Sequence, residues 1–242
     1  MTAIILQARI DSSRLPEKSL LPLGGKPFIL RVMEALNRIP SHLRVLACTE
    51  DSIAAFAPLA GEAGFTLFAG SKDDVLERYC CALRKFNVSQ VIRATGDNPF
   101  VFADAAAAIN AEAMALGADY AGYSGLPYGA GVEAICAQAL LRAEAEAAAR
   151  YEREHVCPYL YGHPELFSLH RPLTPLRWQG GSASQSLDVR LTVDTEEDYE
   201  RAQILYAALD TMEADGTLTG DQRYHGPAII QAFRQVFPGA EQ

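Results

Sequence analysis

The 242-residue chain is poor in positive charge: 21 Lys and Arg stand against 30 Asp and Glu, a formal net charge of −9. This balance argues against general adhesion to nucleic acid or to an anionic membrane. The five cysteines form no C-x-x-C pair, which disfavours a zinc site or disulfide framework and favours a reducing compartment. No basic N-terminal region precedes an apolar run, and no run is long enough to span a bilayer. We therefore expect a soluble, cytoplasmic protein.

Hydrophobic residues make up 49% of the sequence, enough for a sizeable core. In the first half, short apolar runs alternate with segments of helical periodicity. The apolar runs predict buried strands at 3–8, 44–48, 66–69 and 91–95. The periodic segments predict helices at 27–39, 52–63, 73–86 and 103–116. Strands and helices that alternate in this way predict an α/β fold with a mainly parallel sheet flanked by helices.

The regular alternation ends after residue 119. Segment 120–133 holds four glycines and a proline, which predicts a loop that has room for one strand. The remaining segments predict a helix at 138–150, an aromatic stretch at 151–166, a strand at 187–193 and a helix at 195–209. We therefore expect one domain over residues 1–242, built on one sheet, with an excursion at about 120–186.

Residues 8–18 follow the first predicted strand and hold three cations and two serines, in the order ARIDSSRLPEK. Ligands of open α/β sheets bind at the carboxyl ends of strands, and cationic side chains with loop amides bind polyphosphates. The segment therefore predicts a phosphate-binding loop. The alternative is an ordinary solvated basic loop, which fits less well in a chain that is otherwise acidic.

Two carboxylates follow predicted strands elsewhere. Asp97 stands in the run TGDNP after strand 91–95, and Asp194 stands after strand 187–193. Either carboxylate could hold Mg²⁺ at the edge of the sheet. Each also has a structural explanation, a Gly-Asp turn for Asp97 and a helix start for Asp194. Together with the phosphate loop they predict a metal–triphosphate site.

These motifs resemble the CMP–sugar-acid synthetases, and most closely the spore-coat-polysaccharide, acylneuraminate-cytidylyltransferase-like branch. The matching runs occur in family order over about residues 4–200: LQAR at 6–9, SSRLP at 12–16, LGGKP at 23–27, DVLERY at 74–79, TGDNP at 95–99, GVE at 131–133, REHV at 153–156 and VDTEED at 193–198. The chain departs from this pattern at Asp11 and Glu17, where relatives usually carry Gly. We expect these carboxylates to point away from the triphosphate or to meet a cation.

The resemblance implies a Rossmann-like nucleotidyltransferase fold, usually dimeric, and carries site roles onto matching positions. Nucleotide binding falls to Ala8, Arg9, Ser12, Ser13, Arg14, Lys18, Gly70, Asp74 and Thr95. Catalytic roles fall to Arg14, Lys18, Asp97 and Asp194, the last two as ligands of Mg²⁺. The sugar would bind near Glu133, Arg153 and His155.

The implied activity is Mg²⁺-dependent transfer of CMP from CTP to an acidic sugar for surface polysaccharide, with release of pyrophosphate. Positioning and charge stabilisation supply most of such catalysis. Two alternatives stay open: a nucleotidyltransferase that uses another NTP or a sugar-phosphate or phosphonate acceptor, and a nucleotide-binding protein without turnover.

We also expect a homodimer, because the excursion is rich in apolar side chains that a second subunit could cover. The residues concerned are Tyr159, Leu160, Tyr161, Leu166 and Phe167. The alternative is that they pack on the sheet of their own chain.

Overall fold

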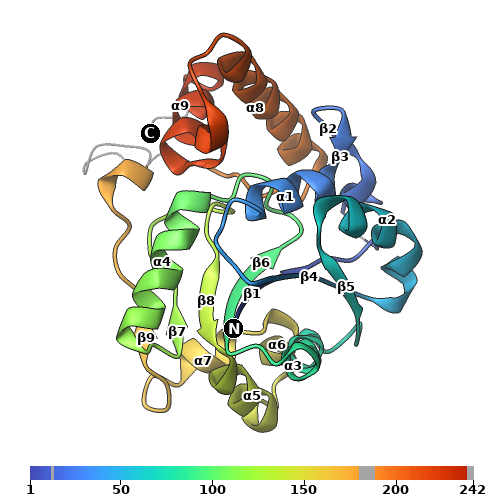
Figure 1. Ribbon diagram of the computed structural model, residues 1–242, viewed down its shortest axis with the longest axis vertical. Helices are drawn as coiled ribbons and strands as arrows, with labels where there is room; N and C mark the ends of the chain where they lie inside the picture. The colour runs from blue at the N-terminus through green and yellow to red at the C-terminus, as the bar shows by residue number, and fades with distance from the viewer. Residues whose placement is uncertain (12–13, 180–188, 239–242) are drawn as a thin grey trace.

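The computed structural model describes residues 1–11, 14–179 and 189–238 (Figure 1). Within these residues the main sheet has seven strands in the order β5-β4-β1-β6-β8-β7-β9. The strands are β1 Thr2–Gln7, β4 Leu43–Cys48, β5 Thr66–Ala69, β6 Gln90–Thr95, β7 Tyr120–Ala121, β8 Glu133–Cys136 and β9 Leu169–His170. Neighbouring strands from β5 to β6 pair in parallel, and β8 is antiparallel to both of its neighbours.

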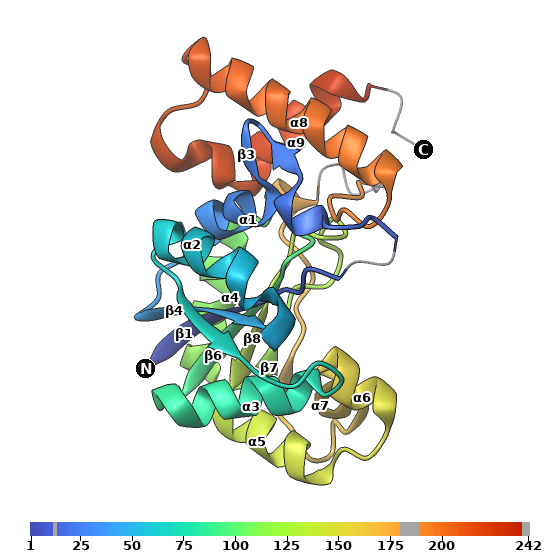
Figure 2. The same ribbon diagram turned by 90° about the vertical axis from the view of Figure 1, so that its right-hand side faces the viewer.

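Helices cover both faces of the sheet. The helices of the described residues are α1 Phe28–Leu36, α2 Ile53–Ala63, α3 Val75–Phe86, α4 Ala103–Leu116, α5 Ala137–Glu146, α6 Arg150–His155, α7 Pro158–Gly162, α8 Glu196–Ala214 and α9 Gly226–Val236. Of these, α8 and α9 pack against each other beyond α1 (Figure 2). A small hairpin (β2 Pro22–Leu23, β3 Lys26–Pro27) follows the short helix η1 Lys18–Leu20. No helix in the described part of the chain is long and apolar enough to cross a membrane.

Side chains of β1 alternate between two hydrophobic cores. Ile4 and Leu6 pack with α1, α2 and α4, whereas Ala3 and Ile5 pack with α3 and α5. Figure 2 shows α1 and α2 above the sheet and α3 and α5 below it. A strand buried on both faces is a continuous apolar run, which is why the sequence predicts β1, β4, β5 and β6 so well.

The α/β prediction is confirmed, and the predicted strands and helices up to residue 116 lie within three residues of the observed ones. Helix 195–209 is also present and continues to Ala214, with Thr195 as its N-cap. The Thr195 hydroxyl accepts from the amide of Asp198 at 3.2 Å, and the Asp198 carboxylate accepts from the amide of Thr195 at 3.1 Å. The T-x-x-D motif thus forms the expected capping box.

Two element predictions are wrong. The helix predicted at 138–150 ends at Glu146, because Ala147 is extended and its carbonyl accepts from Arg153, on the separate helix α6. The strand predicted at 187–193 is absent from its described part: residues 189–193 form no more than a single bridge between Arg190 and Tyr128, and residues 187–188 lie outside the described residues. The alternating Val189, Leu191 and Val193 are all buried, so the period of two reflects burial and not a ladder of hydrogen bonds.

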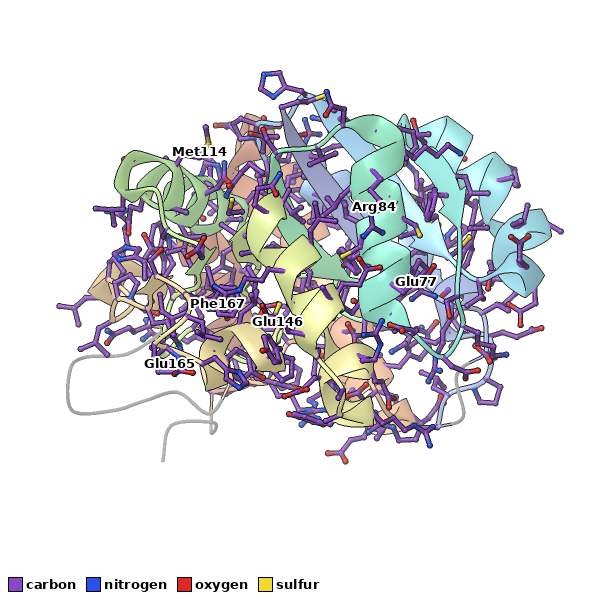
Figure 3. The ribbon with its side chains drawn as sticks, turned by 90° about the horizontal axis from the view of Figure 1, so that it is seen from below. Glu77, Arg84, Met114, Glu146, Glu165 and Phe167 are labelled. Carbon is purple, nitrogen blue, oxygen red and sulfur yellow. The ribbon has the colours of Figure 1, made fainter. Side chains whose placement is uncertain are left out.

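The excursion extends the main sheet, since it supplies β7, β8 and β9. Tyr159, Leu160 and Phe167 are buried against α3 and α5, Leu166 is half-buried, and Tyr161 is 37% exposed. Figure 3 shows α3 and α5 side by side on this face, with Phe167 beside α5. The expectation that these side chains are exposed is therefore wrong for all but Tyr161, and the argument for a dimer that rested on it is lost.

Candidate active site

A cavity of about 630 Å³ lies at the carboxyl ends of β1 and β6. Its floor includes Gln7, Ala8 and Thr95, and helix α6 of the excursion contributes to its wall. Four carboxylates line it, namely Asp73, Asp97, Glu154 and Asp194. Seven cations line it, namely Arg9, Arg14, Lys18, Lys72, Arg78, Arg93 and Arg150. In a chain of net charge −9, a cavity with this excess of cations suits an anionic ligand.

The two predicted metal ligands lie on adjoining loops. The amide of Val193 donates to the carbonyl of Asp97 at 2.9 Å, which joins the loop after β6 to the segment before α8. Lys18 lies between them: its ammonium donates to the carbonyl of Val193 and stands 3.9 Å from Asp194 Oδ1. Burial lowers the pKa of Lys18, while the charges of Asp97 and Asp194 oppose that change. Three predicted site residues thus form one cluster.

Asp97 and Asp194 differ in their partners. Asp194 lies 3.2 Å from Arg14 and 2.8 Å from Arg190. Asp97 Oδ1 is buried and accepts no hydrogen bond from any described residue. A buried carboxylate oxygen without a donor suits a cation, and Mg²⁺ is held in proteins by one or two carboxylates together with substrate phosphates and water. No group of three or more His, Cys, Asp or Glu in the described ranges could hold a metal alone, so ligand oxygens would have to complete the shell.

The predicted phosphate-binding loop carries two carboxylates, Asp11 and Glu17, which were expected to point away from a triphosphate or to meet a cation. Asp11 meets cations: Lys72 contacts its Oδ2, and Arg9 Nε lies 3.7 Å from its Oδ1. Glu17 is exposed and has a left-handed backbone, with φ of +51°. Glycine adopts this conformation at little cost, so a glycine would fit the backbone at this position. Ser12 and Ser13 lie outside the described residues.

Gly70 and Asp74, predicted to bind the nucleotide, do not line the cavity, although their neighbours Lys72, Asp73 and Val75 do. Asp74 is the N-cap of α3, where its Oδ1 accepts from the amide of Glu77 at 2.9 Å. Its other oxygen accepts from Arg153 Nε. Gly70 has a packing role, since a Cβ there would stand 2.9 Å from Cγ of Arg78.

The residues predicted for the sugar separate into two groups. His155 lines the cavity, 4.5 Å from the Tyr151 ring, between centroids. Arg153 does not line it: besides Asp74, its guanidinium donates to the carbonyls of Glu144 at 2.9 Å and Ala147 at 3.0 Å. Arg153 therefore fastens α6 to α3 and α5. Glu154, which belongs to the run 153–155 predicted to face the sugar, also lines the cavity. Arg150 of the same helix lines it too, and the sequence did not predict that.

Glu133 lies behind the cavity wall, in a buried polar network. Its carboxylate accepts from Arg93 Nη1, from the Tyr120 hydroxyl at 2.9 Å and from the Cys157 thiol at 3.4 Å. Arg93 does line the cavity, and its Nη2 donates to Gln7 Oε1 at 3.1 Å. Burial works against the charge of Arg93, but the nearby Glu133 raises its pKa. Arg93 was also missed, although it stands just before Thr95 and Asp97 in the sequence.

A mainly parallel sheet, a cationic loop after its first strand and two carboxylates on adjoining loops are the parts that a nucleotidyltransferase needs. The family model for cytidylyltransferases matches residues 3–218. The chain belongs to the cytidylyltransferase family.

Two curated proteins are similar to this chain in sequence. The spore coat polysaccharide biosynthesis protein SpsF of Bacillus subtilis is 30% identical over 209 residues, which cover 84% of this chain and 85% of SpsF. A 3-deoxy-manno-octulosonate cytidylyltransferase of Photorhabdus laumondii is 33% identical over 106 residues, 42% of this chain and 41% of that protein.

Solved structures share the fold. A cytidylyltransferase from Leptospira borgpetersenii has a TM-score of 0.83 at 22% identity, over 100% of this chain and 96% of that one. A CMP:2-keto-3-deoxy-manno-octonic acid synthetase in complex with CTP has a TM-score of 0.64 at 15% identity, over 85% and 98%. A manganese complex of a Mycobacterium tuberculosis protein has a TM-score of 0.58 at 15% identity, over 84% and 97%.

Proposed function

We propose that the chain transfers CMP from CTP to an acidic sugar, with Mg²⁺ as the divalent cation, and releases pyrophosphate. The observation that carries the proposal is the joining of Asp97 and Asp194 through the Val193 amide, next to Lys18 and Arg14. The relatives support the choice of CTP and of an acidic acceptor, since one of them is a 3-deoxy-manno-octulosonate cytidylyltransferase. SpsF supports a role in surface polysaccharide synthesis.

In this proposal each residue at the phosphate end of the cavity has a separate role. Asp97 and Asp194 hold the cation, which neutralises charge on the phosphate oxygens when bound. Lys18 is buried and fixed by Val193, so it presents its charge without a change of rotamer. Arg14 is largely exposed and can exchange its contact with Asp194 for the departing pyrophosphate.

The acceptor end of the cavity is formed by α6 and Arg93. His155 and Arg150 stand on the wall, and Arg93 is held in place by Glu133 and Gln7. A guanidinium with fixed partners orients an anionic or hydroxylated ligand at low entropic cost. We therefore assign the sugar to this end and treat Glu133 as the residue that positions Arg93.

Pyrophosphate release tests the proposal against its two alternatives. The purified protein is supplied with Mg²⁺ or Mn²⁺, each of CTP, UTP, GTP and ATP, and a panel of sugars with and without a carboxylate. The proposal expects release with CTP and a carboxylated sugar only. Release with another NTP, or with a sugar phosphate, would support the first alternative. Tight NTP binding without release would support a nucleotide-binding protein without turnover.

The homodimer and the cytoplasmic location stay predictions. Because most apolar side chains of the excursion are buried, a dimer would have to use another surface. Sedimentation velocity at micromolar concentration decides this: a species of one chain's mass, 26.3 kDa, would rule the dimer out.

A further inference from the structure

Tyr128 is an aromatic side chain that lines the cavity and is 65% exposed. It stands in the loop between β7 and β8. Among the described residues that line the cavity, it is the one tyrosine, phenylalanine or tryptophan, and most of the others are charged or polar. Apolar surface inside a cavity is where a bound ligand gains from the removal of water. The exposed ring therefore marks a place where a ligand can pack.

The backbone of Tyr128 is fixed, although its side chain is exposed. Its amide donates to the carbonyl of Val189 at 3.2 Å, and its carbonyl accepts from the amides of Leu191 at 2.7 Å and Thr192 at 3.2 Å. The next residue, Gly129, has φ of +94°, and a Cβ there would stand 2.4 Å from the amide nitrogen of Thr192. Only glycine allows this close approach. The ring is therefore carried on a backbone that is attached to the segment before α8.

Arg190 covers one face of the Tyr128 ring. Its guanidinium carbon lies 5.1 Å from the centre of the ring. The same guanidinium is held by Asp194 at 2.8 Å and by Asp198 at 3.0 Å, so the ring has a fixed cationic partner on this side. Because one face is covered and 65% of the residue is exposed, the other face is open. Arg190 thus joins an open aromatic face to Asp194, one of the two residues assigned to the cation.

We propose that Tyr128 binds the acceptor sugar by packing its open face against the C–H groups on one face of the sugar ring. This inference rests on the proposed function. The acceptor hydroxyl has to reach the phosphorus beside the cation site, so the sugar ring must lie close to Asp97 and Asp194. Phosphate groups gain nothing from an aromatic surface, whereas a pyranose buries the C–H groups of one face on it. Arg93 and α6 line the same cavity and supply polar contacts, and Tyr128 supplies the apolar one.

The test compares Tyr128→Ala with the wild type in the pyrophosphate-release assay, with the carboxylated sugar of the panel that the wild type uses fastest. KM for the sugar should rise about tenfold, because the apolar contact is lost. The value of kcat and the affinity for CTP, the latter from calorimetric titration, should stay unchanged. Tyr128→Phe keeps the ring and should behave as the wild type does.

Leu116→Ala is the matched control, since Leu116 is 63% exposed at the end of α4 and does not line the cavity. It should change neither KM nor CTP affinity. The melting temperature of Tyr128→Ala should stay close to that of the wild type, because the side chain is exposed and the backbone contacts of the loop remain.

Four results would overturn the inference. An unchanged KM in Tyr128→Ala means that the ring does not bind the sugar, and an equal loss of CTP affinity assigns the ring to the nucleoside. A lower kcat at unchanged KM means that Tyr128 acts through Arg190 and Asp194. A KM in Tyr128→Phe as high as in Tyr128→Ala assigns the effect to the hydroxyl group. A wild type that uses no sugar of the panel contradicts the proposed function, and the inference with it, whereas the four results above leave the proposed function standing.

Discussion

The amide of Val193 donates to the carbonyl of Asp97 at 2.9 Å, and this contact sets Asp194 beside Asp97. We expect Asp97→Asn and Asp194→Asn each to reduce turnover at least about a hundredfold, roughly 2.7 kcal/mol of barrier, because an amide holds a hard cation poorly. Steady-state pyrophosphate release at varied Mg²⁺ measures this. Asp221→Asn, an exposed carboxylate that pairs with Arg38, is the control. Near-normal metal-dependent turnover in both site variants would show that the metal assignment is wrong.

The assignment of Arg14 and Lys18 to the phosphates of CTP predicts a selective loss of affinity for the triphosphate. Arg14→Ala and Lys18→Ala should weaken CTP binding far more than cytidine binding, since both cations are assigned to the β,γ-phosphates. Calorimetric titration with each ligand gives the two affinities. An equal loss for cytidine would place these residues elsewhere or show that they act through folding.

Lys18 also predicts a pH dependence. Burial lowers its pKa, so the ammonium loses its proton at a lower pH than an ordinary lysine does. CTP affinity should therefore fall as the pH rises through that lowered pKa. Lys18→Arg stays charged in this range, and its CTP affinity should lack this decline. The same decline in Lys18→Arg would assign it to another group.

Much of this site follows from the order of the sequence. Buried parallel strands place Arg9 after β1 and Asp97 after β6 at one edge, which the apolar runs alone predict. The direction of a side chain on a short helix is not predictable in the same way. Arg150 and Arg153 stand on one six-residue helix, yet Arg150 lines the cavity and Arg153 is bound to Asp74 and two carbonyls. Tertiary contacts decide which of the two arginines faces the cavity, and no local sequence pattern contains them.

The sheet beyond β6 was missed for a similar reason. Strand β8 has only four residues, Glu133–Cys136, and its antiparallel pairing with β6 is a long-range contact without a local signal. Arg78 likewise belongs to the amphipathic helix α3, and no local pattern predicts that its side chain is buried. Its contact with the carbonyl of Ser71 becomes visible only once the neighbours of its guanidinium are known.

Glu133→Gln should weaken the use of the acceptor sugar and leave the binding of CTP unchanged. The variant leaves the buried Arg93 without its counter-charge, so the guanidinium at the sugar end loses its fixed position. We expect KM for the acceptor to rise about tenfold or more while CTP affinity is unchanged. Equal effects on both substrates would show that Glu133 supports the whole cavity. A purely structural role of Glu133 would lower the stability of the protein without a selective effect on the acceptor. The melting temperatures of Glu133→Gln and of the double variant Arg93→Met/Glu133→Leu are therefore compared. The double variant should recover part of the melting temperature that Glu133→Gln loses, because it no longer buries an uncompensated charge.

Asp198 predicts a stability change at acid pH. It is 4% exposed and accepts from the amides of Asp194 and Thr195 and from Arg190 and Arg201. Burial alone would raise its pKa, but these hydrogen bonds hold it far below the usual range. A lowered folded-state pKa gives stability that is present above the ordinary aspartate range and is lost as the pH falls below it.

Asp198→Asn should therefore lower the free energy of unfolding at neutral pH by about 3 kcal/mol, since it leaves the two arginines and the cap short of a charged acceptor. Urea unfolding at pH 7 and pH 3 measures this. The difference between wild type and variant should shrink at the lower pH. A gap of constant size would mean that the carboxylate charge is not what stabilises the start of α8.

Pyrophosphate release from CTP, with Mg²⁺ and a carboxylated sugar such as 3-deoxy-manno-octulosonate, tests the central claim most directly. Mass spectrometry of the same reaction identifies the nucleotide product. The account predicts a CMP–sugar adduct and one pyrophosphate for each CTP consumed, both formed at least about a hundredfold more slowly by Asp97→Asn. An unmodified CTP pool across the whole panel of acidic sugars, with wild-type protein shown to be folded, would contradict it.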